Sequence, residues 1–382
     1  MARGTYIAPS EWRLIYRFWQ SASGFWRGPS AWRIWLLTAL LITTVIAQLL
    51  ILYWLNYWNR DFFNAIERKD TIAVWTQAKM FVPLVISSVA VAIISMWGRM
   101  TMQRKWRQWL SKHMFDYWLG NGHSRRLKFM AGETQTPEYR IAEDARVATE
   151  APIDLALGLL TSLLTAATFI RVLWTIGDVL FVNAFGLTIA IPRFLVIAVI
   201  VYSILLTTAT IVIGRHFTRV IEGKNRAEAE LRSIGSHLRE TSEGTALPDG
   251  KIDGRRRAVL ALDQVIARWL EVCWQFVRLT VISQMSLILT PVVALLLCMP
   301  KYLDGSMSLG EVVQAAAAFV MVQGAFNWVQ DNFGRLADWT SSANRVASLL
   351  LGLDQIEEPK DGGVSTDPHA EIAANVGQSD RL

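Results

Sequence analysis

Six stretches of the chain are apolar and roughly as long as a membrane-spanning helix. An α-helix needs about 20 apolar residues to cross a bilayer. The predicted spans are Ile34–Leu55, Met80–Trp97, Leu155–Ile170, Phe194–Gly214, Leu279–Pro300 and Val312–Gln330. The third is the shortest, and it reaches spanning length if Asp154 or Arg171 at its ends snorkels or faces the other helices. The pattern predicts an all-α, polytopic membrane protein with six transmembrane helices.

The connections between these spans differ in length and composition. Residues 98–154 and 215–278 are long, charged and rich in helix-forming residues. They are either solvated helical loops or long extensions of the transmembrane helices that meet in a helical turn. Leu247–Gly254 predicts a turn-rich break. Val179–Pro192 is apolar but too short to span, and we expect an external hairpin or a re-entrant piece.

The distribution of Lys and Arg orients the predicted spans. With the N-terminus in the cytoplasm, 31 of the 38 Lys and Arg residues fall in segments assigned to the cytoplasmic side. This matches the positive-inside rule and places both termini in the cytoplasm. Only 18% of the residues are charged and 17 are Trp, as expected for a membrane protein with aromatic belts. The net charge of +6 therefore indicates a membrane face and no nucleic-acid partner.

The domain organisation follows from this pattern. Residues 1–33 form a cytoplasmic N-terminal segment that is polar and aromatic, and they lack the features of a cleavable signal peptide. Residues 34–355 form the six-helix transport domain. Residues 356–382 are rich in Gly, Pro, Asp and Ser, which is typical of a flexible tail or linker.

Motifs for catalysis are missing from the sequence. It contains no G-x-x-x-x-G-K-[ST] loop for ATP phosphates, no H-E-x-x-H and no G-x-S-x-G. The two Cys and five His residues are scattered, without metal-type spacing. The sequence therefore predicts a transporter, channel or assembly factor, with no enzyme activity, metal or cofactor of its own.

Several motifs stand in a fixed order along the chain. They are NYWNRDFFNAIERKD (56–70), WRQWLSKHMFDYWL (106–119), RIAEDAR (140–146), IAIPRFLVIAVIVY (189–202), NRAEAELR (225–232), GAFNWVQDNF (324–333) and LADWTSSANRVASL (336–349). Over residues 10–355 the chain resembles the membrane domain of the SbmA/BacA-like peptide uptake transporters. It is equally similar to that of the ABC transporters related to BacA and to the peroxisomal fatty-acyl transporters.

This resemblance implies an exporter-type ABC transmembrane domain in the bacterial inner membrane. It implies a homodimer that imports peptides or other bulky amphipathic solutes by alternating access. The energy would come from a separate or missing ATPase domain, so that ATP acts only through a partner, or from a proton gradient. One departure is Thr136-Pro137-Glu138-Tyr139, where the ABC pattern has Asn-Pro-Asp-Gln. The alternative function is a non-transporting remnant or regulatory subunit that only dimerises.

The resemblance also assigns candidate coupling residues. Arg140, Glu143 and Asp144 match the R-x-x-E-D motif, and helical spacing places Arg140 and Asp144 on one face. They form either a surface ion pair or a coupling element. Glu228 and Arg232 have the same spacing, either as a solvated stripe or as a contact with an ATPase or a second subunit.

Four further residues are candidates on chemical grounds. Glu150 and Asp154 are acids at the inner edge of the third span, and we expect any proton coupling to use them. Gly324 and Phe326 lie in the sixth span, where a small residue allows helices to pack closely. We expect helix packing there, with the lining of a cavity as the alternative.

Overall fold

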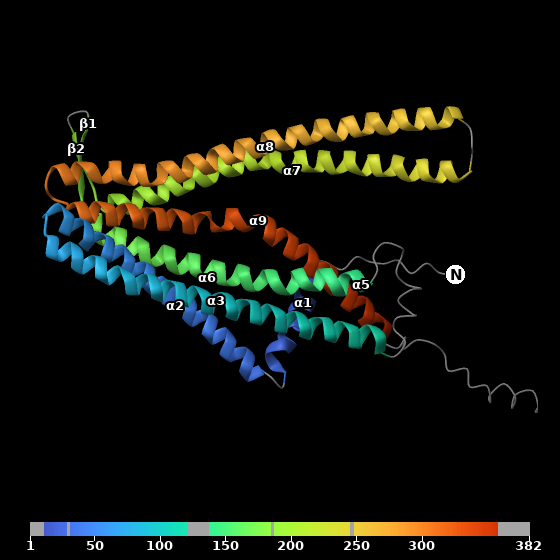
Figure 1. The fold of residues 1–382 in the computed structure, drawn as a ribbon, viewed down its shortest axis with the longest axis horizontal. Coiled ribbons are helices and arrows are strands. Elements are labelled where there is room, and N and C mark those ends of the chain that lie inside the picture. The colour runs from blue at the N-terminus through green and yellow to red at the C-terminus, as the bar shows by residue number, and fades with distance from the viewer. Residues whose placement is uncertain (1–10, 29–30, 121–136, 185–186, 245–247, 358–382) are drawn as a thin grey trace, which may run out of the picture. The chain divides into compact units, whose positions relative to one another are not determined.

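The fold is almost entirely helical. The computed structural model describes residues 11–28, 31–120, 137–184, 187–244 and 248–357 (Figure 1). Six helices in these ranges are long and apolar enough to cross a membrane. They are α2 (Ala31–Glu67), α3 (Thr71–Leu119), α6 (Ala145–Ile176), α7 (Phe194–Gly244), α8 (Pro248–Leu303) and α9 (Leu309–Glu357). Each predicted span lies within one of them, so the polytopic all-α fold is confirmed.

The helices continue well beyond the apolar spans. Helices α7 and α8 have 51 and 56 residues, and they lie side by side (Figure 1). The interpretation that the transmembrane helices extend into residues 215–278 is therefore confirmed for residues 215–244 and 248–278, and the turn between them lies outside the described residues. The chain does break between α7, which ends at Gly244, and α8, which begins at Pro248, but residues 248–254 of the predicted turn Leu247–Gly254 are helical, and Leu247 lies outside the described residues. Proline is well tolerated in the first turn of a helix, where its missing N–H costs nothing.

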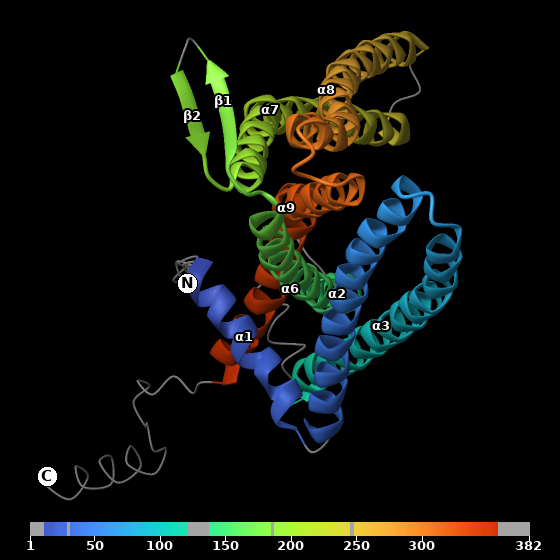
Figure 2. The same cartoon turned by 90° about the vertical axis from the view of Figure 1, so that its left-hand side faces the viewer.

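A β-hairpin connects α6 and α7 (Figure 2). Strands β1 (Leu180–Ala184) and β2 (Leu187–Ile191) pair antiparallel, with Leu180 opposite Ile191 and Ala184 opposite Leu187. Of the two forms expected for Val179–Pro192, the structure shows the hairpin, and its location on the external side stays a prediction.

The chain forms two compact units. The first, here called the polar unit, comprises residues 1–38, 99–154 and 334–382. The second, called the membrane unit, comprises residues 39–98 and 155–333 and contains most of the apolar sequence. Helices α2, α3, α6 and α9 contribute residues to both.

The core of the membrane unit is formed by α6, α7, α8 and α9. Small and aromatic side chains alternate on α9, where Ala315, Ala318, Phe319 and Val322 are completely buried. Small residues let membrane helices approach closely, because apolar burial alone does not drive them together in lipid. In contrast, none of the most apolar stretch of α3 is buried within the chain. That surface must face lipid or another chain.

The end of α2 caps the beginning of α9 within the membrane unit. The Gly310 N–H donates to Asn64 Oδ1 at 2.9 Å, and the Leu309 N–H donates to Glu67 Oε2 at 3.1 Å. A Cβ at Gly310 would collide with the carbonyl of Arg60. These contacts satisfy backbone donors that a helix N-terminus leaves free. Asn64 and Glu67 of the 56–70 motif therefore have a structural role at the beginning of α9.

The polar unit has an aromatic core that includes an N-terminal helix. In α1 (Glu11–Arg27) the ring of Phe25 stacks on Trp106 of α3, with centroids 6.1 Å apart. Phe18 packs edge-on against Trp339 of α9 at 6.4 Å. Residues 11–27 of the predicted N-terminal segment are thus a packed helix. The predicted flexible tail lies outside the described residues from 358 onward, and α9 extends through Glu357.

Candidate functional site

The R-x-x-E-D motif forms a π-helix in the polar unit. A short helical turn, α5 (Pro137–Tyr139), leads into the π-helix Arg140–Asp144, and α6 follows directly. The Ala145 N–H donates to the carbonyl of Arg140, which is the five-residue spacing of a π-helix. Single π-turns are rare and occur often at functional sites. The motif is therefore a local departure from the α-helix.

Asp144 is the buried acid of this motif, and its partner is on α9. Its side chain is only 2% exposed. Arg345 donates to Asp144 Oδ1 through Nε at 2.9 Å and through Nη2 at 2.7 Å. Arg345 also donates to the hydroxyls of Ser341 and Ser342. The hydrogen bond to Asp144 raises the pKa of the Arg345 guanidinium, so Arg345 stays charged.

Arg140 adds a second contact between the π-helix and α9. Its Nη1 donates to Ser348 Oγ at 3.0 Å. Arg140 and Asp144 do share a face, as their spacing predicted, but both face α9. Farther along α9, the Tyr117 hydroxyl donates to Asp354 Oδ1 at 2.8 Å. These three contacts, here called the α9 anchor, fix the end of α9 to α3 and to the π-helix within the polar unit.

Glu143 and Glu150 lie beside the α9 anchor, on the exposed side of the same turn. Arg146 bridges them, reaching Glu143 Oε1 at 2.6 Å and Glu150 Oε2 at 3.0 Å. Arg107 approaches Glu150 at 3.8 Å. The hydrogen bond from Arg146 lowers the pKa of Glu143 below its ordinary value. These exposed ion pairs contribute little to stability by themselves.

Asp154 joins three helices at the end of the polar unit. Its carboxylate accepts from Arg335 Nη2 of α9 at 2.7 Å and from Gln103 Nε2 of α3 at 2.9 Å. Arg99 Nε lies 3.5 Å from the same group. The Asp154 carboxylate thus forms ion pairs with two guanidinium groups, those of Arg99 and Arg335. Proton coupling through Glu150 or Asp154 stays a prediction.

Glu228 and Arg232 lie on the exposed part of α7 and do not pair with each other. Glu228 instead accepts from Lys224 at 3.2 Å, one turn earlier. Lys224 also lies over the ring of Trp269 on α8, 4.8 Å from its centroid. The contact of Glu228 and Arg232 with a partner stays a prediction.

Gly324 and Phe326 do not mark a tight helix contact within the chain. A Cβ built at Gly324 meets nothing within 4 Å, and Phe326 is 43% exposed. Close packing occurs at other glycines. A Cβ at Gly158 of α6 would lie 2.5 Å from Trp328 Nε1 of α9. The packing role of Gly324 is therefore not seen within one subunit, and its role toward a cavity or a second chain stays a prediction.

The sequence reasoning missed the basic partners on α9, Arg335 and Arg345. Both lie in the 336–349 motif or next to it, so the motif was the available signal. Their pairing with Asp154 and Asp144 joins residues about 180 to 200 positions apart. Within the described ranges, no three His, Cys, Asp or Glu side chains lie close enough to hold a metal ion.

The comparisons with known proteins agree with this architecture. Residues 29–303 match the family of the ABC transporter transmembrane region 2. The match covers most of the chain, and the protein belongs to this family of ABC transporter membrane domains. It is a membrane transporter subunit of the exporter-type class, with several helices that cross the membrane.

Three relatives illustrate how broad this family is. The inner membrane ABC transporter ATP-binding protein YddA of Escherichia coli is 25% identical over 81% of this chain and 56% of its own length. An ABC transporter ATP-binding protein of Synechocystis is 24% identical, over 91% and 50%. The chloroplastic ABC transporter D family member 2 of Arabidopsis thaliana is 19% identical, over 92% and 48%. The chain thus spans about half the length of these relatives.

Proposed function

We propose that the protein moves peptides or similar bulky amphipathic solutes across the bacterial inner membrane by alternating access, in the direction of uptake. The observation that carries this proposal is the α9 anchor. It connects the polar turn that precedes α6 with the polar end of α9, a helix that also crosses the membrane. A displacement of the polar unit would therefore be transmitted to two transmembrane helices. Rigid elements joined by charged hydrogen bonds are suited to this task.

An ATPase domain is the proposed source of energy, either on the same polypeptide or as a separate subunit. The relatives are named ATP-binding proteins, and the matched region covers only about half of each. Residues 1–382 contain no phosphate-binding loop. We propose that ATP acts through this partner domain, which contacts the polar unit and the polar ends of α7 and α8 near Glu228 and Arg232. A proton gradient acting on Glu150 or Asp154 is the second proposed source.

We propose that the working unit is a homodimer. The charged part of α8 carries large apolar side chains that are more than half exposed in one subunit. They include Leu260, Ile266, Trp269, Leu270 and Trp274. Arg268 and Glu271 lie among them, which places this surface outside the hydrocarbon. A contiguous apolar surface in water marks an interaction site, and a second copy of the chain is the proposed partner.

The orientation with both termini in the cytoplasm is part of the proposal. It rests on the excess of Lys and Arg in residues 98–154 and 215–278. The polar unit and the polar ends of α7 and α8 then face the cytoplasm, where ATP is available.

Uptake of a fluorescent cationic peptide into proteoliposomes tests the function. One set receives an inward proton gradient without ATP, and a second receives a candidate ATPase with ATP. We expect uptake in the second set and its loss in Asp144→Asn. Uptake only under the proton gradient, abolished by an uncoupler, would assign the energy to protons. A folded dimer without uptake in either set would favour the alternative function, a regulatory subunit that only dimerises.

A further inference from the structure

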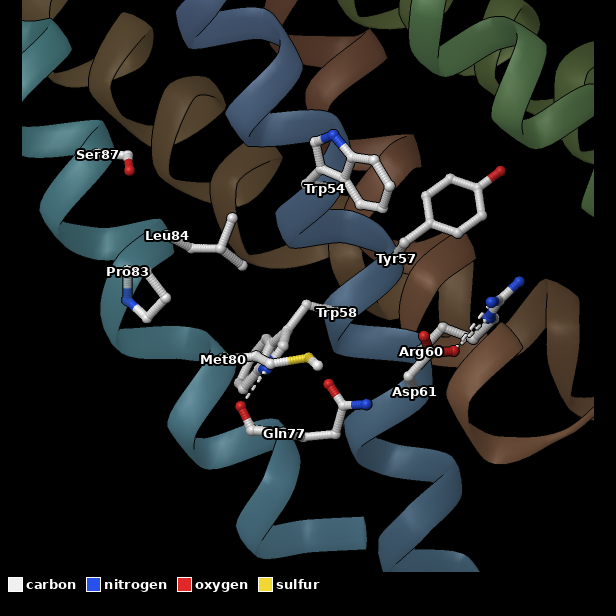
Figure 3. A pocket seen from close by; sticks show the side chains of 10 residues that line it. All are labelled: Trp54, Tyr57, Trp58, Arg60, Asp61, Gln77, Met80, Pro83, Leu84 and Ser87. Atoms are coloured by element: carbon white, nitrogen blue, oxygen red, sulfur yellow. Dashed lines mark hydrogen bonds and ion pairs between the residues drawn. The ribbon is translucent and has the colours of Figure 1, made fainter.

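The membrane unit contains a pocket between α2 and α3 that no part of the proposed function uses (Figure 3). Its volume is about 440 Å³, which is within the usual range for sites that bind small molecules. Helix α2 contributes one wall and α3 the other. The lining residues are Trp54, Tyr57, Trp58, Arg60, Asp61, Gln77, Met80, Pro83, Leu84 and Ser87.

The pocket has a polar end and an apolar end. Arg60 and Asp61 lie within six residues of the end of the apolar span 34–55, so they lie at the edge of the bilayer. Pro83 and Leu84 lie within the span 80–97, at hydrocarbon depth. Figure 3 shows Arg60 and Asp61 at one end of the lining residues, with Pro83, Leu84 and Ser87 toward the other. A molecule that fills the pocket must therefore be charged at one end and apolar at the other.

The polar end carries two opposite charges side by side. Arg60 Nη2 lies 2.9 Å from Asp61 Oδ1, and both side chains are more than one-third exposed. The Arg60 guanidinium also lies over the ring of Tyr57, 4.9 Å from its centroid. This arrangement presents a cation and an anion to one ligand. It complements a head group that contains both a phosphate and an ammonium group.

The walls of the pocket are held by contacts of their own. Trp58 donates from Nε1 to the carbonyl of Gln77 at 2.8 Å. Its ring stacks on Phe62 at 5.0 Å and lies 4.6 Å from Phe81. The backbone of α2 at Arg60 is fixed by the close approach of Gly310 on α9. Because these side chains are already held in place, the binding of a ligand costs less conformational entropy.

We infer that this pocket binds one zwitterionic phospholipid, with its phosphate at Arg60, its ammonium at Asp61, and an acyl chain along Pro83 and Leu84. The inference stands independently of what the protein transports. A lipid in this position would be a fixed component of the α2–α3 hairpin, since the pocket lies at the edge of the bilayer and two of its lining side chains, Trp54 and Met80, are more than half exposed. It would fill the space between two helices that would otherwise have to close or admit water.

Native mass spectrometry of the full chain in detergent tests this inference, with phosphatidylethanolamine and phosphatidylglycerol as probes. We expect wild type to retain one phosphatidylethanolamine per chain and to prefer it over phosphatidylglycerol. The double variant Arg60→Ala/Asp61→Ala preserves the net charge, and we expect it to bind this lipid about tenfold more weakly. Arg68→Ala, which removes an exposed cation just beyond α2, should bind as wild type does.

A second variant separates lipid binding from folding. Leu84→Trp fills the apolar end without changing any charge, and it should also lose the bound lipid while eluting as folded protein. Equal retention of both lipids by wild type would overturn the inference. Unchanged retention by Arg60→Ala/Asp61→Ala would overturn it as well, because the head group would then be bound elsewhere.

Discussion

The guanidinium of Arg345 binds the buried carboxylate of Asp144 through two donors, at 2.9 and 2.7 Å, and so joins α9 to the π-helix before α6. Asp144 Oδ2 is buried and has no hydrogen-bond partner in the described part of the chain. Arg345 therefore supplies the hydrogen bonds that compensate for burying the Asp144 carboxylate. Removing one member of a buried ion pair is costly, because the other member keeps its desolvated charge.

The first prediction concerns this pair. We expect Arg345→Ala to lower the free energy of unfolding by about 2–3 kcal/mol, since it leaves the Asp144 carboxylate buried and unpaired. Arg226→Ala, at an exposed arginine of α7 with a weak ion pair, should change it by less than about 0.5 kcal/mol. Unfolding followed in detergent by tryptophan fluorescence measures both. Equal stability of the two variants would remove the structural role of the Asp144–Arg345 pair.

The second prediction concerns Glu143, whose exposed carboxylate pairs with Arg146. Glu143→Gln should insert, fold and dimerise normally, but its transport activity in proteoliposomes should fall. The hydrogen bond from Arg146 lowers the pKa of Glu143. Its contribution to stability is therefore present above the ordinary carboxylate pKa and is lost only as the pH falls through the lowered value. The difference in stability between wild type and Glu143→Gln should accordingly be constant around neutral pH. Wild-type uptake by the variant would exclude a coupling role for Glu143.

The third prediction uses two glycines of the same helix. A Cβ at Gly310 collides with the Arg60 carbonyl, whereas a Cβ at Gly324 meets nothing within 4 Å. We expect Gly310→Ala to destabilise the protein by about 2 kcal/mol, because α2 and α9 must move apart. Gly324→Ala should be neutral or stabilising by up to about 1 kcal/mol, since alanine is the better helix former. Thermal unfolding in detergent distinguishes the two, and the opposite order would contradict the contact between α2 and α9.

The fourth prediction tests the proposed dimer surface on α8. Leu270 is 59% exposed in one subunit. We expect Leu270→Glu to weaken dimerisation by at least about tenfold, because a charge would be buried at the interface. Light scattering of the detergent-solubilised protein measures the change. Arg226→Gln, at a highly exposed arginine of the neighbouring helix α7, is the control for a change of charge. An unchanged dimer in Leu270→Glu would place the interface elsewhere.

The six spans could be predicted because each is a continuous apolar segment, and all except the third, Leu155–Ile170, have about the length that a bilayer requires. Residues 215–278 were harder, since charged helices and charged loops have similar compositions. The packing of α7 against α8 settles that question, because each helix supports the other. The break between α7 and α8 was predicted a few residues too late in the chain, since residues 248–254 are helical. The Pro, Asp and Gly residues of Leu247–Gly254 favour turns. They nevertheless lie in the first turns of α8, because Pro and Asp are also favoured at the beginning of a helix.

By itself, the sequence determined the number of transmembrane helices, their approximate bounds, the hairpin between α6 and α7, and the shared face of Arg140 and Asp144. These features depend on neighbours within a few turns of the chain. Only the tertiary structure decided that Asp144 pairs with Arg345, that Asp154 pairs with Arg335, and that Gly310 and not Gly324 marks a tight contact. Such contacts join segments about 180 to 250 residues apart, and no local periodicity specifies which distant charge or helix a residue will meet.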